Sequence, residues 1–200
     1  MTHITHAHER AYPKSDPVLF ESRVPIPEIT TYLKSVICTI NSVQYEIDRT
    51  FDPKTFRERL DADLPDSRIK GVKEVFINDV VRLSTLFFHM SRQAKIKVQI
   101  LPVNGNMCRL FHEDYYRQRL LCTYLGPGTE WLDHDNVNRT GLSRGRNGNI
   151  VKDPSRINRA KTFDVLLLQG ARSENGLGVV HRSPPIAKTG QIRLLLKIDE

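Results

Sequence analysis

This chain contains little cysteine, little tryptophan and no long apolar run. Among its 200 residues are three cysteines and one tryptophan, and aromatic residues make up 8% of the sequence. Because the cysteines are odd in number and form no Cys-x-x-Cys pair, they argue against a disulfide framework and against a zinc ribbon. No apolar run approaches the roughly 20 residues that a membrane-spanning helix needs. We therefore expect reduced thiols and no association with a membrane.

The amino-terminal segment lacks the apolar centre of a secretory signal peptide, which predicts a cytoplasmic protein. Residues 1–27 carry scattered polar residues and prolines without a sustained period, so we expect an irregular leader. Its His3, His6 and His8 could bind stray metal, but a flexible tail is the simpler interpretation.

Apolar spacing predicts helices in the first part of the chain. Hydrophobic and charged residues make up 39% and 26% of the sequence, as expected of a soluble globular protein, and the length suits a single domain over residues 28–200. The three-and-four spacing of apolar residues predicts helices over residues 29–47, 53–64 and, most clearly, 67–92. We interpret residues 28–93 as a helical support for the rest of the domain.

The pattern changes from helical to strand-like after residue 93. Predicted strands cover residues 95–101, 107–112, 119–125, 163–170, 178–181 and 192–198. Short strands separated by glycine and proline turns, without helices between them, indicate an antiparallel barrel or a double-sheet jelly roll. The predicted fold class is therefore α+β. We expect residues 94–200 to form an antiparallel double-stranded β-helix, jelly-roll-like or cupin-like, with the amino-terminal helices packed outside it.

Two imidazoles and one carboxylate fall at the ends of predicted strands. His112 and Asp114 are two residues apart, so both side chains point to the same side of a strand, and His181 ends a later strand. Two histidines and one carboxylate can hold one face of an octahedral ferrous ion and leave the opposite positions open. Each histidine taken alone could equally be structural. Together the three residues predict a metal site, in which they are both the ligands and the catalytic residues.

Arg193 lies in the last predicted strand, where its planar guanidinium could pair with a carboxylate. The structural alternative is a surface ion pair with Asp199 or Glu200, which would contribute little to stability. With the two histidines and the aspartate, an arginine available to a carboxylate completes the parts of an iron-dependent oxygenase site.

The formal net charge of +7 is concentrated in one segment. Residues 139–161 hold seven basic residues and one acid. The segment is rich in glycine and asparagine and nearly free of aromatic residues, so it lacks the stacking side chains typical of single-strand nucleic-acid binding. We interpret it as a solvated, mobile loop. The alternative is an electropositive lid that attracts an anionic substrate, because the segment lies between the two parts of the metal motif.

Two blocks of the sequence resemble a known family. The stretch FHEDYYRQRLLCTYLGPGTEWL, residues 111–132, is followed by GVVHRSPP at residues 178–185 and by a terminal RLLLKID. These blocks resemble an uncharacterised bacterial family, the domain-of-unknown-function 1826 family, and the resemblance extends over roughly residues 20–200. The family itself implies no activity.

A second, weaker resemblance is to the iron(II) and 2-oxoglutarate dioxygenases. Their His-x-Asp pair, distal histidine and subsequent arginine match His112, Asp114, His181 and Arg193. The resemblance implies that the first three residues bind Fe(II) and that 2-oxoglutarate is the co-substrate. The distal carboxylate of 2-oxoglutarate would then pair with the arginine.

The same resemblance implies further contacts to the co-substrate. Arg119 and Thr123 share one face of a predicted strand, and we expect both to hydrogen-bond 2-oxoglutarate. The primary substrate would be a small molecule or a protein, and an anionic one if the basic segment acts as a lid.

Two other classes of function remain open. The same ligands could hold zinc or another divalent ion in a cupin-like barrel without redox chemistry, although zinc sites usually recruit more cysteine or a third histidine. A nucleic-acid-binding module is the more distant alternative. It would bind through the basic segment, weaken steeply with salt and ignore metal.

Overall fold

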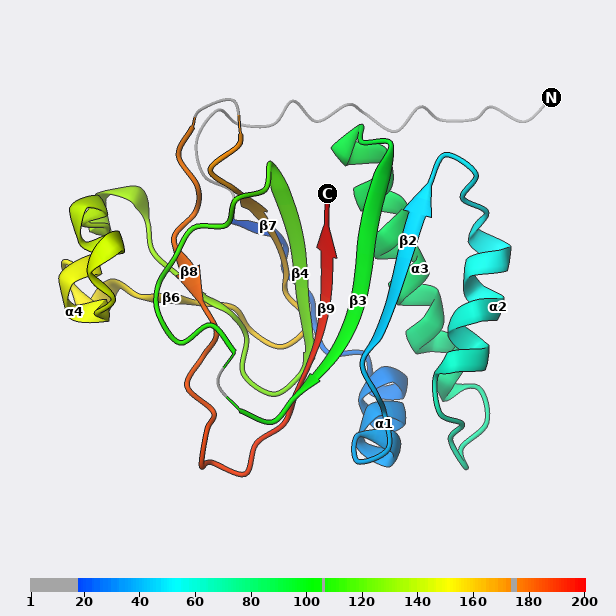
Figure 1. Ribbon diagram of the computed structural model, residues 1–200. Coiled ribbons are helices and arrows are strands. Elements are labelled where there is room, and N and C mark those ends of the chain that lie inside the picture. The colour runs from blue at the N-terminus through cyan, green and yellow to red at the C-terminus, as the bar shows by residue number, and fades with distance from the viewer. Residues whose placement is uncertain (1–17, 106, 174–175) are drawn as a thin grey trace.

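The computed structural model describes residues 18–105, 107–173 and 176–200. Most of the expected leader, including its three histidines, therefore lies outside the described residues. The described strands are β1 (Leu19–Glu21), β2 (Val43–Asp48), β3 (Lys95–Val103), β4 (Gln118–Leu125), β5 (Glu130–Trp131), β6 (Asn158–Arg159), β7 (Val165–Gln169), β8 (His181–Arg182) and β9 (Arg193–Asp199). They form a six-stranded antiparallel sheet of order β1-β7-β4-β9-β3-β2 and a three-stranded antiparallel sheet of order β6-β5-β8 (Figure 1).

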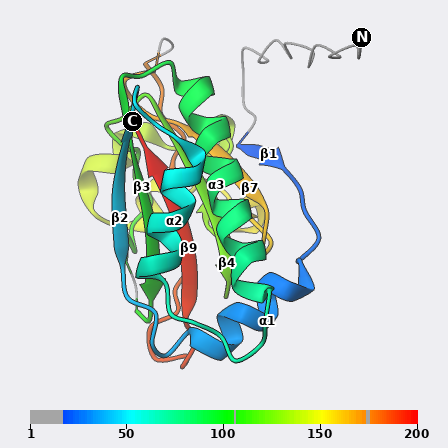
Figure 2. The same cartoon turned by 90° about the vertical axis from the view of Figure 1, so that its right-hand side faces the viewer.

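Helices cover one face of the larger sheet (Figure 2). They are α1 (Pro27–Val36), α2 (Pro53–Asp63) and α3 (Val72–Ser91). The Asp52 side chain caps α2 by accepting from the backbone N–H groups of Lys54 and Thr55, and Pro53 suits the first helical turn. A short helix, α4 (Asn147–Ile150), lies apart from the other helices, beyond the smaller sheet (Figure 1).

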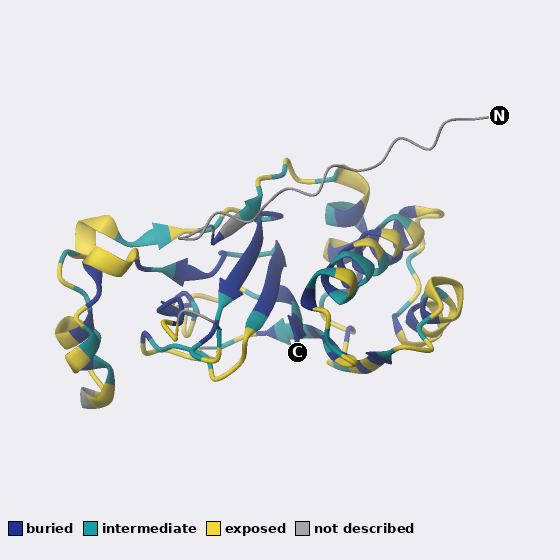
Figure 3. Cartoon of the chain, turned by 90° about the horizontal axis from the view of Figure 1, so that it is seen from above, coloured by how far each residue is buried: buried dark blue, intermediate teal, exposed yellow. Residues whose placement is uncertain are grey.

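Alternation along β4 divides the interior into two parts. Leu120, Cys122 and Tyr124 point toward the helices and belong to the main core with α1, α2 and α3. Leu121 points the other way and packs in a second cluster that includes Trp131 of the smaller sheet. Figure 3 shows buried residues along the strands and exposed residues on the outer helix faces and in the segment that projects with α4. Because β-strand side chains alternate, Arg119, Leu121 and Thr123 share the face toward the space between the sheets.

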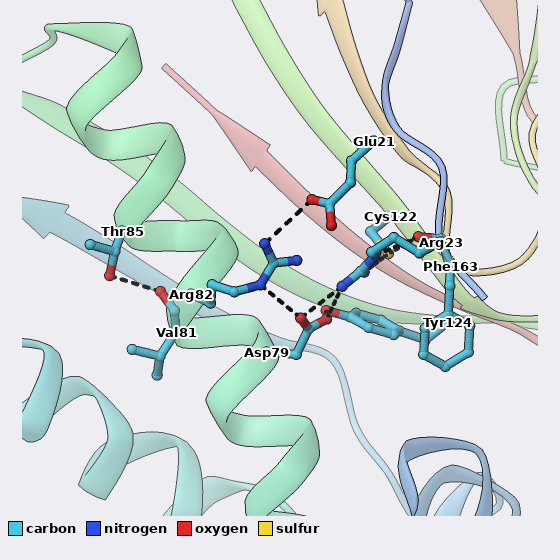
Figure 4. A network of polar contacts seen from close by, with 9 residues as sticks. All are labelled: Glu21, Arg23, Asp79, Val81, Arg82, Thr85, Cys122, Tyr124 and Phe163. Carbon is cyan, nitrogen blue, oxygen red and sulfur yellow. Dashed lines mark hydrogen bonds and ion pairs between the residues drawn. The ribbon is translucent and has the colours of Figure 1, made fainter. Parts of the chain in front are cut away.

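A buried ionic network on the helix side ties the amino-terminal segment to α3 (Figure 4). The Asp79 carboxylate accepts two hydrogen bonds from Arg23, at 2.7 and 2.9 Å, and one from the Tyr124 hydroxyl, at 2.6 Å. Burial by itself raises the pKa of Asp79, but the bonds from Arg23 and Tyr124 outweigh it and hold the pKa below its usual value. The network fixes the connection between β1 and α1 against the sheet.

The α+β class and the antiparallel pairing are confirmed, and so are the helices expected near residues 53–64 and 67–92. The finer double-stranded β-helix stays a prediction.

No helix in the described ranges is both long and apolar enough to cross a membrane.

The helix predicted over residues 29–47 is wrong in its second half. Helix α1 ends at Val36, and residues 43–48 form β2, which pairs along its whole length with β3. The three-and-four apolar spacing continues across the boundary through Ile40, Val43 and Ile47, so periodicity alone could not separate the two elements.

Two further predictions need correction. The described end of the leader is not irregular, because residues 19–21 form β1 and pair with β7. Residues 107–112 do not form a regular strand; only His112 makes an isolated bridge, to His181. Residues 19–21 are thus ordered by pairing with β7, whereas residues 107–112 have one isolated β-bridge.

Candidate metal centre

His112, Asp114 and His181 come together beside the smaller sheet. Their potential ligand atoms all lie within 4.8 Å of one another. The His112 Nε2 lies 3.6 Å from Asp114 Oδ1, and the His181 Nε2 lies 3.3 Å from Asp114 Oδ2. The three residues that the sequence singled out are thus neighbours in space, and their role as metal ligands stays a prediction.

The backbone sets the spacing of the two histidines. The N–H of His112 donates to the carbonyl of His181 at 3.0 Å, and the N–H of His181 donates to the carbonyl of His112 at 2.9 Å. Residues paired in this way on antiparallel strands carry their side chains on the same face, and here the ring centroids are 4.6 Å apart. The fold therefore holds the two imidazoles side by side.

Each imidazole is oriented by a backbone carbonyl. The Nδ1 of His112 lies 2.9 Å from the carbonyl oxygen of Leu110, and the Nδ1 of His181 lies 3.1 Å from that of Val179. Because a carbonyl can only accept, each Nδ1 carries a proton, and the Nε2 of each ring faces Asp114. Histidines that bind metals are usually fixed by such an outer hydrogen bond.

Arg119 connects the Asp114 carboxylate to the larger sheet. Its guanidinium donates to Asp114 and, from Nε at 2.5 Å, to Asp199. Burial raises the pKa of Asp114, but its contacts with His112, with His181 and with the Arg119 charge together hold the pKa well below its usual range. Asp114 is therefore an anion at neutral pH. The contact expected between Arg119 and a co-substrate stays a prediction, and the described contacts assign Arg119 to the orientation of Asp114.

Arg193 is completely buried, with an exposed fraction of 0%. Its terminal nitrogens donate to three hydroxyls, on Ser183 at 3.2 Å, Thr123 at 3.1 Å and Thr129 at 3.3 Å, while its Nε has no hydrogen-bond partner among the described residues. Burial lowers the pKa of Arg193 to about 10, and no carboxylate in the described chain offsets this effect. The arginine thus keeps unused capacity to donate to an anion.

The surface ion pair considered for Arg193 is wrong. Asp199 instead pairs with Arg119 and lies 3.3 Å from the Lys197 ammonium group. Thr123, expected to contact a co-substrate, holds the Arg193 guanidinium in the structure, and its contact with 2-oxoglutarate stays a prediction.

Strand β4 links the two parts of the candidate site. Arg119 contacts Asp114 near one end of the strand, and Thr123 contacts Arg193 nearer the other end. The two β4 residues share a strand face and lie roughly 13 Å apart along the strand. Both therefore project into the space between the sheets.

An open groove borders the metal centre. Its volume is about 540 Å³, and it is lined by Met107, Cys108, Arg109, Leu110 and His112. The His112 side chain is 32% exposed, whereas that of His181 is only 5% exposed. A molecule in the groove would reach the centre from the His112 side.

The basic segment 139–161 contains short helices and strand β6, so its interpretation as a loop is wrong, although many of its residues are exposed to solvent as that interpretation expected. Ile150 is buried in a small core with Phe111 and Val180, the neighbours of the two histidines. Much of the positive charge is paired, as in the Arg156–Asp135 contact at 2.8 Å. The alternative of a lid stays a prediction.

Sequence reasoning missed several residues around the centre. Glu113 lies between His112 and Asp114 but accepts a hydrogen bond from Arg139, at 2.8 Å. The Asn147 side chain bonds to the backbone on the other side of His112. Nothing in the local sequence separates these residues from ordinary surface groups, because their partners come from distant segments.

Comparisons with known proteins give one family and several distant structures. The profile of a family described as "Protein of unknown function (DUF1826)" matches residues 17–199. No curated protein sequence matches the chain.

Among solved structures, the chain is distantly similar to a carboxy-terminally truncated protein from Neurospora crassa in its apo form, with 13% identity, a TM-score of 0.41, and 82% of this chain and 62% of the other covered. For the Fe(II)/(alpha)ketoglutarate-dependent dioxygenase TqaL, the identity is 12%, the TM-score 0.45 and the coverage 88% and 74%. For a putative oxygenase from Shewanella oneidensis, the values are 14%, 0.39, 79% and 61%. The chain thus spans 62% of the length of the Neurospora chain. Because all three TM-scores are below 0.5, these similarities give no argument for an activity of this chain.

Proposed function

The chain belongs to the DUF1826 family, whose description names no reaction, and we propose that it is a non-haem iron(II), 2-oxoglutarate-dependent oxygenase-like protein that hydroxylates or oxidises its substrate. The observation that carries this proposal is the combination of a two-histidine, one-carboxylate cluster with a buried arginine that has no described acid partner. The two sheets would then be the halves of a double-stranded β-helix around the site.

The donor set suits ferrous iron. His112 and His181 would each offer the Nε2 atom, and Asp114 offers an anionic oxygen, which together can occupy one face of an octahedron. Structural zinc sites usually have four protein ligands, commonly including cysteine. When bound, iron(II) with 2-oxoglutarate would supply an oxidant by coupling the reduction of oxygen to decarboxylation of the oxo acid.

Arg193 fits the distal carboxylate of 2-oxoglutarate. A buried charge without a counter-ion is costly, so a fully buried arginine held only by hydroxyls favours a role in binding an anion. A carboxylate would satisfy the free donor capacity through charge-assisted hydrogen bonds. Thr123, Thr129 and Ser183 would keep the guanidinium in place before the co-substrate arrives.

Other residues of the chain would keep the site ordered and dry. Arg119 holds Asp114 through a guanidinium that is also anchored to Asp199. The apolar side chains of Leu121 and Leu195 are buried between the sheets, where they would exclude water from the co-substrate.

The substrate would enter along the groove beside His112. The groove is open and is bordered by the exposed Arg109, which suits a small molecule or a protein segment with a negative group. The described ion pairs of the basic segment leave less free charge for nucleic acid than composition suggested.

The second candidate, a cupin-like protein that holds zinc or another divalent ion without redox chemistry, would use the same three ligands. This alternative does not explain why Arg193 is buried without a described acid partner.

The test is anaerobic reconstitution followed by controlled exposure to oxygen. Protein purified anaerobically is loaded with Fe(II) and 2-oxoglutarate, exposed to oxygen and assayed for succinate. We expect one iron per chain and formation of succinate that requires iron, 2-oxoglutarate and oxygen together. Stable metal binding with no binding of 2-oxoglutarate would support the cupin-like alternative instead.

A further inference from the structure

Arg139 joins the two segments that carry the candidate metal ligands. One terminal nitrogen of its guanidinium donates to Glu113 Oε2 at 2.8 Å, and the other donates to the carbonyl of Gly178 at 3.0 Å. Glu113 Oε2 also accepts from the backbone N–H of Gly178, at 3.0 Å. Glu113 lies between His112 and Asp114, and Gly178 lies three residues before His181. The arginine and glutamate therefore form a closed ring with both backbone polar groups of Gly178.

The packing at Gly178 depends on the absence of a side chain. A Cβ atom there would lie 2.9 Å from the Cβ and from the Oε2 of Glu113. Real Cβ atoms essentially never approach other atoms so closely, so the two ligand-bearing segments meet at a distance that only glycine allows. The ring is thus a close, specific contact rather than a loose surface pair.

Asn147 makes an equivalent contact on the other side of His112. Its Oδ1 accepts from the backbone N–H of Phe111 at 2.8 Å, and its Nδ2 donates to the carbonyl of Arg109 at 3.2 Å. The side chain therefore replaces a neighbouring strand for the residues that lead to His112. Without it, this stretch would keep the bridge between His112 and His181 and the backbone bond from the N–H of Ser183 to the carbonyl of Cys108.

The basic segment places Arg139 and Asn147 on the two sides of His112 along the chain. A Cβ atom at Gly141 would lie 2.0 Å from the carbonyl oxygen of Asn149, so the two arms of the segment touch through their backbones. The buried Ile150 packs against the core beneath the two histidines. The segment is therefore shaped to support the centre from outside.

We propose that Arg139 and Asn147 are positioning residues that hold the candidate ligands in register for metal binding. This inference rests on the proposed metal site but not on oxygenase chemistry. The ring contributed by Arg139 sets the separation between the His112–Asp114 segment and the His181 segment, and Asn147 sets the direction of the chain at His112. The basic segment serves as a scaffold for the centre through these two contacts.

The experiment measures Co(II) binding by titration calorimetry and by the visible spectrum of the bound ion, in the full chain without 2-oxoglutarate. Variants are Arg139→Gln, Arg139→Lys and Asn147→Ala. The matched control is Arg156→Gln, in the same segment, because Arg156 pairs with Asp135 and is not bonded to either ligand-bearing segment. Thermal unfolding of each apo variant shows whether it is folded.

We expect Arg139→Gln and Asn147→Ala to weaken Co(II) binding by about 10- to 100-fold, as is typical when the outer partners of metal ligands are removed. The spectrum of the bound ion should change, Arg139→Lys should recover part of the affinity, and Arg156→Gln should bind like the wild type. If Arg139→Gln does not fold, Asn147→Ala, which leaves the ring intact, applies the same test.

Wild-type affinity and spectrum in folded Arg139→Gln and Asn147→Ala would overturn the positioning role alone. Failure of the wild-type chain to bind Co(II), Fe(II) or Mn(II) would instead overturn the proposed metal site, and this inference with it.

Discussion

His112 and His181 exchange two backbone hydrogen bonds, of 3.0 and 2.9 Å, so the main chain rather than the imidazoles holds the two segments together. Any side chain at these positions can keep the bridge. The two imidazoles can therefore be removed by substitution without loss of the backbone bridge that joins their segments.

The first prediction follows from this bridge. His112→Ala, Asp114→Ala and His181→Ala should each abolish stoichiometric binding of Fe(II) or Mn(II). The thermal unfolding temperature of the apo protein should change little in the two histidine variants and should fall in Asp114→Ala, which also breaks the largely buried ion pair with Arg119. Metal analysis and circular dichroism measure the two effects. His89→Ala is the control, since His89 is exposed on α3 and should leave metal binding intact. A double variant of His112 and His181 that retained stoichiometric metal would exclude this site.

The second prediction concerns the network around Asp79. Asp79→Asn removes the charge that pairs with Arg23 in a largely buried position, so the free energy of unfolding at pH 7 should fall by about 3–5 kcal/mol. Urea titration measures this loss. Asp135→Asn, which breaks an exposed ion pair, should leave the free energy nearly unchanged.

The pH dependence of that loss has a definite sign. Because the pKa of Asp79 is lowered in the folded state, its stabilisation is complete above the unfolded pKa of about 3.9 and is lost as the pH falls from there through the folded pKa. The stabilities of wild type and Asp79→Asn should therefore converge below about pH 4. A difference that stayed constant down to acid pH would show that Asp79 does not act through its charge.

The third prediction concerns residues 139–161, which we expected from their composition to form a loop. Ile150 is 1% exposed, so Ile150→Ala should lower the free energy of unfolding by about 2–5 kcal/mol through loss of buried apolar contact. Denaturant unfolding checks the size of the effect. Ile69, which is 49% exposed, provides the control, and Ile69→Ala should have a much smaller effect. Equal effects of the two substitutions would mean that the basic segment is not packed.

The success and failure of sequence reasoning have physical causes. The proximity of His112 and Asp114 was predictable because a spacing of two places both side chains on one side of an extended chain. The family resemblance is confirmed by the match over residues 17–199. By contrast, the contact between Arg119 and Asp199 joins residues that are 80 positions apart, and no local pattern encodes it.

Two of the errors came from local patterns that tertiary packing overrides. Apolar spacing across Ile40 and Val43 suited a helix, but six paired residues with β3 favoured a strand. The charge and glycine content of residues 139–161 suggested a solvated loop, yet scattered apolar residues such as Leu142 and Ile150 join a small core. Because these apolar residues are too sparse to give a helical or strand period, the sequence pattern could not predict this small core.

The central claim is that Arg193 binds the distal carboxylate of 2-oxoglutarate at a metal-loaded site. The most direct measurement is calorimetric titration of 2-oxoglutarate into the Mn(II)-loaded protein without oxygen. Loss of a buried, charge-assisted contact in Arg193→Ala should weaken binding by about 2–5 kcal/mol while metal stays bound. Arg193→Lys keeps the charge but not the planar fork, so its affinity should fall between the two. Arg57→Ala, at a partly exposed arginine of α2, should bind like the wild type. Absence of binding to the wild type, or equal binding to wild type and Arg193→Ala, would contradict the account.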